Sequence, residues 1–143
     1  MRANRFVLDT NILISYFITK NENRLLDFVT ENKISLYVCN ELLNEIEKVL
    51  GYSHLKKYGI NIRESLHFVK RIGVQFQLTY PIKNYLLSDT DDNYIIALAL
   101  QTNSGYVTSG DKHILNEKNR LEKKYPKLHI ITKTEFEKMF SEN

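Results

Sequence analysis

The chain has 143 residues, carries a formal net charge of +3, and contains 43% hydrophobic and 26% charged residues. This length predicts one domain over residues 1–143, and the composition is that of a soluble globular protein. No stretch approaches the roughly 20 apolar residues of a membrane span, and the N-terminus lacks the apolar core of a signal peptide. Because Cys39 is the one cysteine, an intramolecular disulfide is impossible. We therefore expect a cytoplasmic protein with no membrane partner.

Short apolar strands and helices alternate along the first half of the chain. The strand at 34–38 is apolar enough to be covered on both faces. The helix that follows it gathers its apolar residues into one arc, and Asn40 is a good N-cap for it. The elements expected in this half are strands at 6–9 and 34–38, and helices at 11–18, 23–32 and 40–50.

The same alternation continues in the second half, after a less clear stretch that begins at Gly51. The helix at 88–103 starts with capping acids and becomes strongly apolar. The other elements expected here are helices at 61–72 and 133–140, and strands at 73–78, 105–111 and 128–132. Strands that alternate with helices favour an α/β domain, with a mainly parallel central sheet and helices on both faces.

Acidic residues follow the strands of this expected sheet. Asp9 comes at the end of one apolar strand, and Asp111 follows another after a sharp break at Ser-Gly. Asp91 and Asp92 open a helix that leads into the strand before Asp111, which puts them at the same edge. In open parallel sheets, sites form beyond the carboxyl ends of the strands. Glu45 lies in the helix that follows the second strand, so these acids are candidates for one site.

Each acid also has a purely structural explanation. Asp9 and Asp111 are suited to N-cap a following helix, a contribution of about 0.5–2 kcal/mol each. The acids that open the 88–103 helix complement its dipole. Glu45 flanks the apolar arc of its helix, but Glu47 flanks the other edge equally well. Periodicity does not choose between these two glutamates.

A cation would explain why a fold should collect several carboxylates. Carboxylates within a few ångströms repel one another and shift one another's pKa values. Oxygen donors without a Cys or His cluster suit a hard ion such as Mg²⁺ or Mn²⁺ rather than zinc. The histidines are scattered and show no ligand spacing; they are His54, His67, His113 and His129. We interpret them as surface or packing residues.

Four motifs occur in a characteristic order: "FVLDTNIL", "NELLNEIEKVL", "DTDDNYIIALAL" and "YVTSGDKHIL". In this order they resemble the PIN-domain family of metal-dependent ribonucleases, and most of all the toxin components of VapBC-type toxin–antitoxin pairs. The resemblance runs from Arg5 to about Ile131. It implies a three-layer α/β domain and a site for one or two Mg²⁺ or Mn²⁺ ions.

The resemblance also assigns roles to individual residues, and it selects the helix glutamate that precedes "VL". The implied catalytic and metal-binding acids are Asp9, Glu45, Asp92 and Asp111. The implied supporting residues are Asn11, Asp91 and Ser109. Asn11 matches the polar residue that steadies the first acid. The segment "VTSGD" is one residue longer than the "VTGD" expected before the last acid.

The activity that this resemblance implies is hydrolysis of RNA phosphodiester bonds by a metal-dependent endoribonuclease, the toxin of a toxin–antitoxin pair. RNA needs positive charge beside the acids, and Lys112 is the best candidate for a phosphate contact. Lys118 and Arg120 are further candidates, although this stretch is equally typical of a solvated helix face. The family often forms homodimers, for which the helices at 11–18 or 61–72 are candidate surfaces, and a cognate antitoxin is expected to cover the acids.

Three alternatives differ in class. A catalytically silent PIN-like module would bind only RNA or a protein, but such modules usually lose one or more acids. A housekeeping RNA-processing nuclease would share the site and lack an antitoxin. A phosphatase with an aspartate nucleophile would carry "DxD" after its first strand, where this chain has "DTN".

Overall fold

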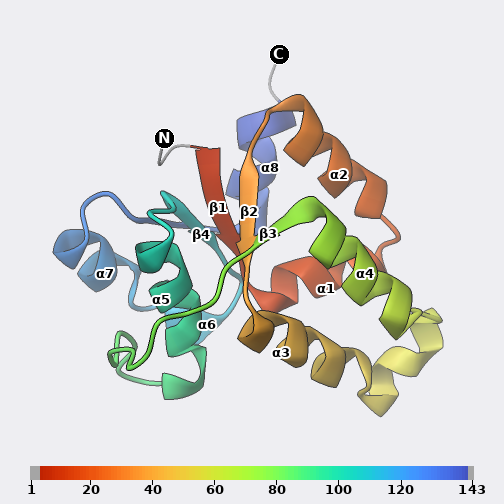
Figure 1. The fold of residues 1–143 in the computed structure, drawn as a ribbon, viewed down its shortest axis with the longest axis horizontal. Helices are drawn as coiled ribbons and strands as arrows, with labels where there is room; N and C mark the ends of the chain where they lie inside the picture. The colour runs from red at the N-terminus through yellow and green to blue at the C-terminus, as the bar shows by residue number, and fades with distance from the viewer. Residues whose placement is uncertain (1–3, 142–143) are drawn as a thin grey trace.

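The computed structural model describes residues 4–141, and its centre is a five-stranded parallel sheet (Figure 1). The strand order is β3-β2-β1-β4-β5. The strands are β1 (Arg5–Leu8), β2 (Ser35–Val38), β3 (Gly73–Gln75), β4 (Tyr106–Thr108) and β5 (His129–Ile131). The single domain predicted over residues 1–143 extends at both ends beyond the described residues.

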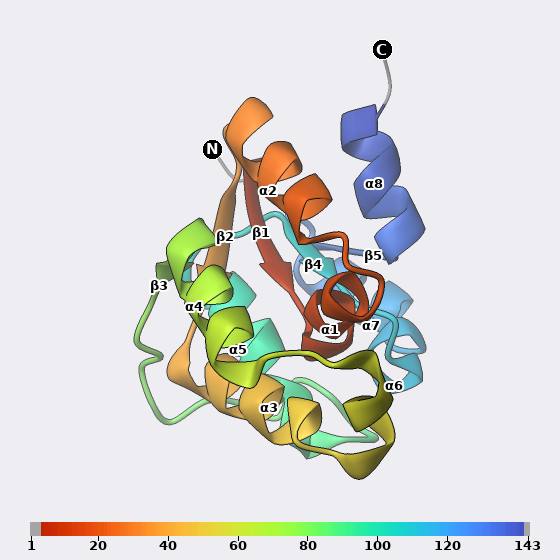
Figure 2. The same cartoon turned by 90° about the vertical axis from the view of Figure 1, so that its right-hand side faces the viewer.

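Helices cover both faces of this sheet, which confirms the predicted three-layer α/β class. Figure 1 shows α1, α2 and α4 on one side of the strands and α5 and α7 on the other, and Figure 2 shows α5 behind the strands when α4 is in front. The helices are α1 (Thr10–Ile18), α2 (Glu22–Glu31), α3 (Asn40–Leu50), α4 (Ile62–Ile72), α5 (Asn93–Gln101), α6 (Lys112–Leu115), α7 (Lys118–Lys124) and α8 (Lys133–Ser141). Two 3₁₀ segments are η2 (Ser53–Tyr58) and η3 (Thr90–Asp92). Every helix in the described part of the chain falls short of the length and apolarity that crossing a bilayer requires.

The centre of the sheet is apolar on both faces because helices cover both faces. Phe6 and Val7 of β1 are completely buried. Phe6 pairs with Tyr106 in the neighbouring strand, and the two rings stack with centroids 4.8 Å apart. Phe136 of α8 meets Phe6 edge-on at 5.4 Å. On the other face, α5 has five consecutive residues, 95–99, that are fully buried, as expected for a helix that is apolar all round.

The strand order reverses between β1 and β4. From β1 the chain moves outward to β2 and β3, whereas from β4 it moves the other way to β5. The Asp9 backbone N–H donates to the Thr108 carbonyl at 2.9 Å, so the two strands remain paired to their carboxyl ends. In open α/β sheets a crevice forms at such a reversal. Asp9 and the residues after Thr108 therefore emerge at its mouth.

Two local predictions are wrong. Asn40 does not cap α3: it is the first helical residue, and the cap is Cys39, whose extended backbone (φ −137°, ψ 168°) carries no side-chain capping bond. The helix proposed over 11–18 as an apolar dimer surface is α1, and its apolar side chains are already in the core, with Leu13 2% and Phe17 1% exposed. The strand expected over 73–78 is present but ends at Gln75.

Candidate metal centre

Asp9 is both a helix cap and a wall of a cleft. Its carboxylate is almost buried, with 4% of the residue exposed. One oxygen accepts a hydrogen bond from the Thr10 N–H at 2.7 Å, and the other accepts from the Ser109 hydroxyl at 2.7 Å. Burial raises the pKa of Asp9, and the nearby charges of Asp111 and Glu45 raise it further, although the two hydrogen bonds oppose this. The capping and site interpretations of Asp9 are therefore compatible.

Ser109 links the first acid to the last. Its side chain is fully buried, and its hydroxyl donates to Asp9 while accepting from the Asp111 N–H at 3.0 Å. Asn11 contacts the same turn: its side-chain oxygen accepts from the Gly110 N–H at 3.2 Å. Asn11 was expected to steady Asp9 directly, but the bond that the structure gives it holds the turn before Asp111. The extra residue in "VTSGD" is thus accommodated by two side chains.

Three carboxylates lie close enough together to share an ion. Oxygens of Asp89, Asp92 and Asp111 all lie within 4.8 Å of one another. Asp111 caps α6 by accepting from the His113 N–H at 2.8 Å, and Asp89 caps η3 by accepting from the Asp91 N–H at 3.0 Å. Each of these two caps uses only one carboxylate oxygen, so the other can face the cluster.

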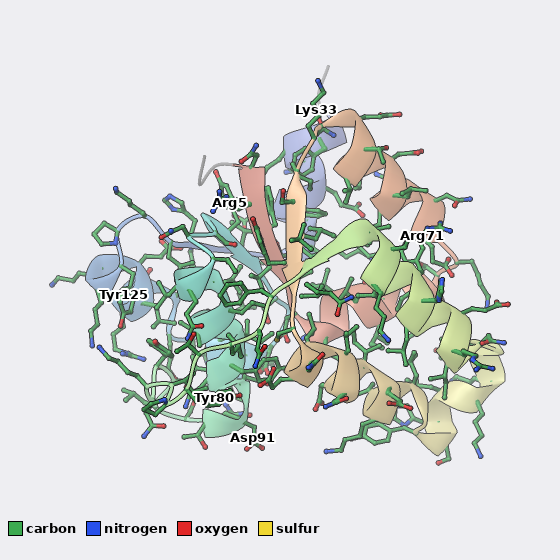
Figure 3. The ribbon with its side chains drawn as sticks, in the orientation of Figure 1. Arg5, Lys33, Arg71, Tyr80, Asp91 and Tyr125 are labelled. Atoms are coloured by element: carbon green, nitrogen blue, oxygen red, sulfur yellow. The ribbon has the colours of Figure 1, made fainter. Side chains whose placement is uncertain are left out.

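The cluster contains Asp89 rather than Asp91. Asp91 was predicted as a supporting residue, but it is exposed at the edge of the molecule (Figure 3). Asp89 and Asp92 are three residues apart in a 3₁₀ turn, a spacing that places side chains on the same side. This spacing is the signal in "DTDD" that sequence reasoning missed.

The four predicted acids line one cleft of about 420 Å³. Glu45 reaches it from α3, whereas Glu47 is exposed and is absent from the lining. The lining residues are Asp9, Thr10, Asn11, Ile14, Ser15, Ile18, Glu45, Val49, His54, Leu55, Asp92 and Asp111. This lining contains carboxylates from four separate segments of the chain and no lysine or arginine.

The electrostatics of the cleft match the demand for a cation. The pKa of Asp92 is raised to about 8, first by burial, then by its hydrogen bond with Asp111, and then by the charges of Asp9, Asp111 and Asp89. The pKa of an acid rises in this way when negative neighbours surround it and no nearby positive charge balances them. The donors are oxygens alone, which suits a hard divalent ion. The residues therefore fit a site for Mg²⁺ or Mn²⁺.

The basic residues after Asp111 differ in whether other groups of the protein already bind their charged ends. Lys118 donates to the Ile130 carbonyl at 2.7 Å and pairs with Glu122, and Arg120 donates to the Tyr85 carbonyl and to Glu117. Both cations are thus engaged in holding the fold together. Lys112 is exposed and directly follows Asp111, so it is the better placed of the three predicted phosphate contacts.

Fold and cleft together define a class: a parallel α/β domain whose strand-end acids meet where the strand order reverses. Residues 5–113 match the family model of the PIN domain. The chain therefore belongs to the PIN-domain family, as its motifs indicated.

Comparison with solved structures finds the same fold in another protein. One similar chain comes from the crystal structure of VapBC2 from Rickettsia felis, bound to a DNA fragment from their promoter. The TM-score is 0.56 and the sequence identity is 16%, with 90% of this chain and 98% of that chain covered. No curated protein matches the chain. At this identity, the likeness establishes the fold.

Proposed function

We propose that this protein is a divalent-metal-dependent endoribonuclease, and that it acts as the toxin of a toxin–antitoxin pair. The observation that carries the proposal is the cleft, in which Asp9, Glu45, Asp92 and Asp111 meet from separate elements without a lysine or arginine among them. Membership of the PIN-domain family supports nuclease activity, and the similarity to a chain of VapBC2 supports the toxin role.

The acids of the cleft would hold one or two Mg²⁺ or Mn²⁺ ions. Such an ion, when bound, lowers the pKa of its water and stabilises the charge on the phosphate. Asp9 and Asp111 are the expected direct ligands, because they follow the ends of the neighbouring strands β1 and β4 and share Ser109 as a bridge. Asp92 would ligate the ion directly or through water. Glu45 reaches the cleft from α3 and would orient the attacking water.

The other residues of the site keep these groups in place and bring the RNA to them. Ser109 holds Asp9 by donating to one carboxylate oxygen, and Asn11 holds the turn that carries Asp111. Lys112 contacts a phosphate of the RNA, which offsets the repulsion between the backbone and the acids. Hydrolysis in line with the scissile bond leaves a 5′-phosphate and a 3′-hydroxyl.

Partner proteins complete the proposal. The similarity to a chain of VapBC2 supports a cognate antitoxin, which would cover the acid cleft and block RNA. The protein would act in the cytoplasm and form a homodimer. Since the apolar side chains of α1 are buried in the core, the partly buried face of α4 is the remaining predicted surface for that dimer.

A thermal melt with and without metal tests the proposed site. Wild type, Asp9→Asn and Asp27→Asn are melted in EDTA and in millimolar Mn²⁺ or Mg²⁺. Separate folded samples of the three proteins are incubated with labelled single-stranded RNA and DNA to measure cleavage. Asp27 is an acid on α2, outside the cleft, so its variant controls for loss of charge. A ligand that binds only the folded state raises its stability.

We expect metal to raise the melting temperature of wild type and Asp27→Asn but not that of Asp9→Asn, which stays folded and does not cleave RNA. A wild-type protein that ignores both ions would contradict the proposal and favour a silent RNA- or protein-binding module. Cleavage of DNA instead of RNA would refute the substrate.

A further inference from the structure

A carboxylate outside the cleft holds the segment that carries Asp89 and Asp92. Glu117 lies between α6 and α7 and is 9% exposed. One of its oxygens accepts from the Leu87 N–H at 2.9 Å, and the same oxygen accepts from the Ser88 N–H at 3.2 Å and the Ser88 hydroxyl at 3.1 Å. The other oxygen accepts from the Leu87 N–H at 3.0 Å. Glu117 thus binds the two residues that immediately precede Asp89.

This contact matters because the segment has little structure of its own. Between the end of β3 at Gln75 and the start of η3 at Thr90, the chain forms no helix or strand. Backbone N–H groups in such a segment need partners from elsewhere in the fold. Asn93 supplies one by accepting from the Leu86 N–H at 2.8 Å. Glu117 supplies the partners for the next two N–H groups along the chain.

Glu117 is also attached to the other side of the acid cluster. It follows α6, the short helix that Asp111 caps. On this helix, a ring nitrogen of His113 lies 3.2 Å from the Ser88 hydroxyl. The hydroxyl of Ser88 is therefore shared between a residue just after Asp111 and the carboxylate of Glu117. These contacts join the segment before Asp89 to the segment after Asp111.

Glu117 remains ionised in this position. Burial raises its pKa, but the guanidinium of Arg120 and the N–H groups of Leu87 and Ser88 outweigh burial, so the pKa is lowered overall. Arg120 also donates to the Tyr85 carbonyl, which adds a second tie to the same segment. A charged acceptor makes stronger hydrogen bonds than a neutral one.

We propose that Glu117 is a positioning residue of the metal centre: it holds Asp89 and Asp92 at the separation from Asp111 at which the three carboxylates share an ion. This inference rests on the proposed function, and it adds a residue that touches neither metal nor RNA. It also explains why Arg120, predicted as an RNA contact, pairs with Glu117 and the Tyr85 carbonyl. Outer partners of metal ligands typically change metal affinity by about 10–100-fold when they are removed.

The chain offers a matched control for this role. Glu122, on α7, pairs with Lys118 and accepts from the Ile130 N–H at 2.8 Å, and its pKa is also lowered. Glu122 therefore resembles Glu117 in charge and in its bonds to a cation and a backbone N–H. The difference is that Glu122 holds β5, whereas Glu117 holds the acid-bearing segment.

The experiment titrates Mn²⁺ into wild type, Glu117→Gln and Glu122→Gln, following melting temperature and RNA cleavage. We expect both variants to lose stability. Only Glu117→Gln should need more Mn²⁺ for half-maximal response, by about tenfold or more, and saturating Mn²⁺ should restore most of its cleavage. The measured split between metal requirement and maximal rate separates positioning from a general loss of fold.

Three results would overturn the inference. Glu117→Gln with the wild-type Mn²⁺ requirement would do so, and so would an equal rise in both variants. If Glu117→Gln does not fold, Ser88→Ala decides: it removes one bond to Glu117 and the contact with His113 but leaves the backbone N–H bonds. We expect a smaller rise in the Mn²⁺ requirement. No rise would refute the role. A wild-type protein without any Mn²⁺ response would refute the proposed function itself.

Discussion

Replacing Asp92 by asparagine should stabilise the metal-free protein and weaken its response to metal. The pKa of Asp92 is raised from 3.8 to about 8, by burial first and then by its hydrogen bond with Asp111. Because the folded pKa lies above the unfolded value, this group contributes its full stability below about pH 4. That contribution is lost as the pH rises through about 8. The amide of the Asp92→Asn variant would carry no charge at any pH and would donate to Asp111 as the protonated acid does.

The size of the effect follows from the shift in the pKa. A rise in the pKa from 3.8 to about 8, at 1.36 kcal/mol for each pKa unit, gives a ceiling of about 6 kcal/mol. Asp92 is only half-buried, so solvent screening reduces this value substantially. We expect Asp92→Asn to exceed wild type by about 2 kcal/mol at pH 8 in EDTA, or about 6 °C in melting temperature for a chain of this length. At pH 4 the two proteins should be equally stable.

The assay is a series of melts between pH 4 and pH 9, in EDTA and in saturating Mn²⁺, with Asp27→Asn as the control for loss of an acid outside the cleft. In Mn²⁺ the order should reverse, because wild type gains a ligand-binding contribution that the variant has largely lost. A variant that is less stable than wild type in EDTA at pH 8 would refute the electrostatic argument. A difference independent of pH would also refute it.

Two further predictions concern the glutamate and the serine of the site. Glu45→Gln should slow cleavage at saturating metal by about a hundredfold, whereas a Glu47→Gln variant, changed at an exposed position, should cleave at the wild-type rate. Single-turnover assays compare the two variants, and equal rates would show that Glu45 has no role in the site. Ser109→Ala should lower the free energy of unfolding by about 1–3 kcal/mol, because Asp9 loses a hydrogen-bond donor and the Asp111 N–H loses an acceptor. Urea denaturation measures this change, and an unchanged midpoint would show that the Ser109 bridge does not stabilise the fold.

Local sequence pattern was sufficient for the fold class. The apolar run in β1 and the alternation of such runs with helices predict a parallel sheet covered on both faces, because only buried strands tolerate apolar residues at every position. The uniformly apolar run in α5 likewise predicts a buried helix. The order of the motifs then identified the family, since each motif combines a strand end or helix start with an acid.

The order of the strands was decided by long-range pairing. Nothing in the local pattern says that β1 lies beside β4, yet this pairing brings the Ser109 hydroxyl onto Asp9, 100 residues away along the chain. The pairing depends on which apolar faces can be buried together, and that is a property of the whole domain. The bridge between the first and last acids follows from it.

The roles of the polar residues depended most on the tertiary structure. Periodicity left Glu45 and Glu47 equivalent, and only Glu45 reaches the cleft. Asp89 joins the cluster in preference to its neighbour Asp91 because it lies three residues before Asp92, on the same side of the turn. The sequence suggested that Arg120 is available to bind RNA, but Arg120 forms an ion pair with Glu117. The spacing of apolar residues along the chain indicates which of them are buried. The role of a charged side chain depends instead on the partners within a few ångströms of it, and those partners come from distant parts of the sequence.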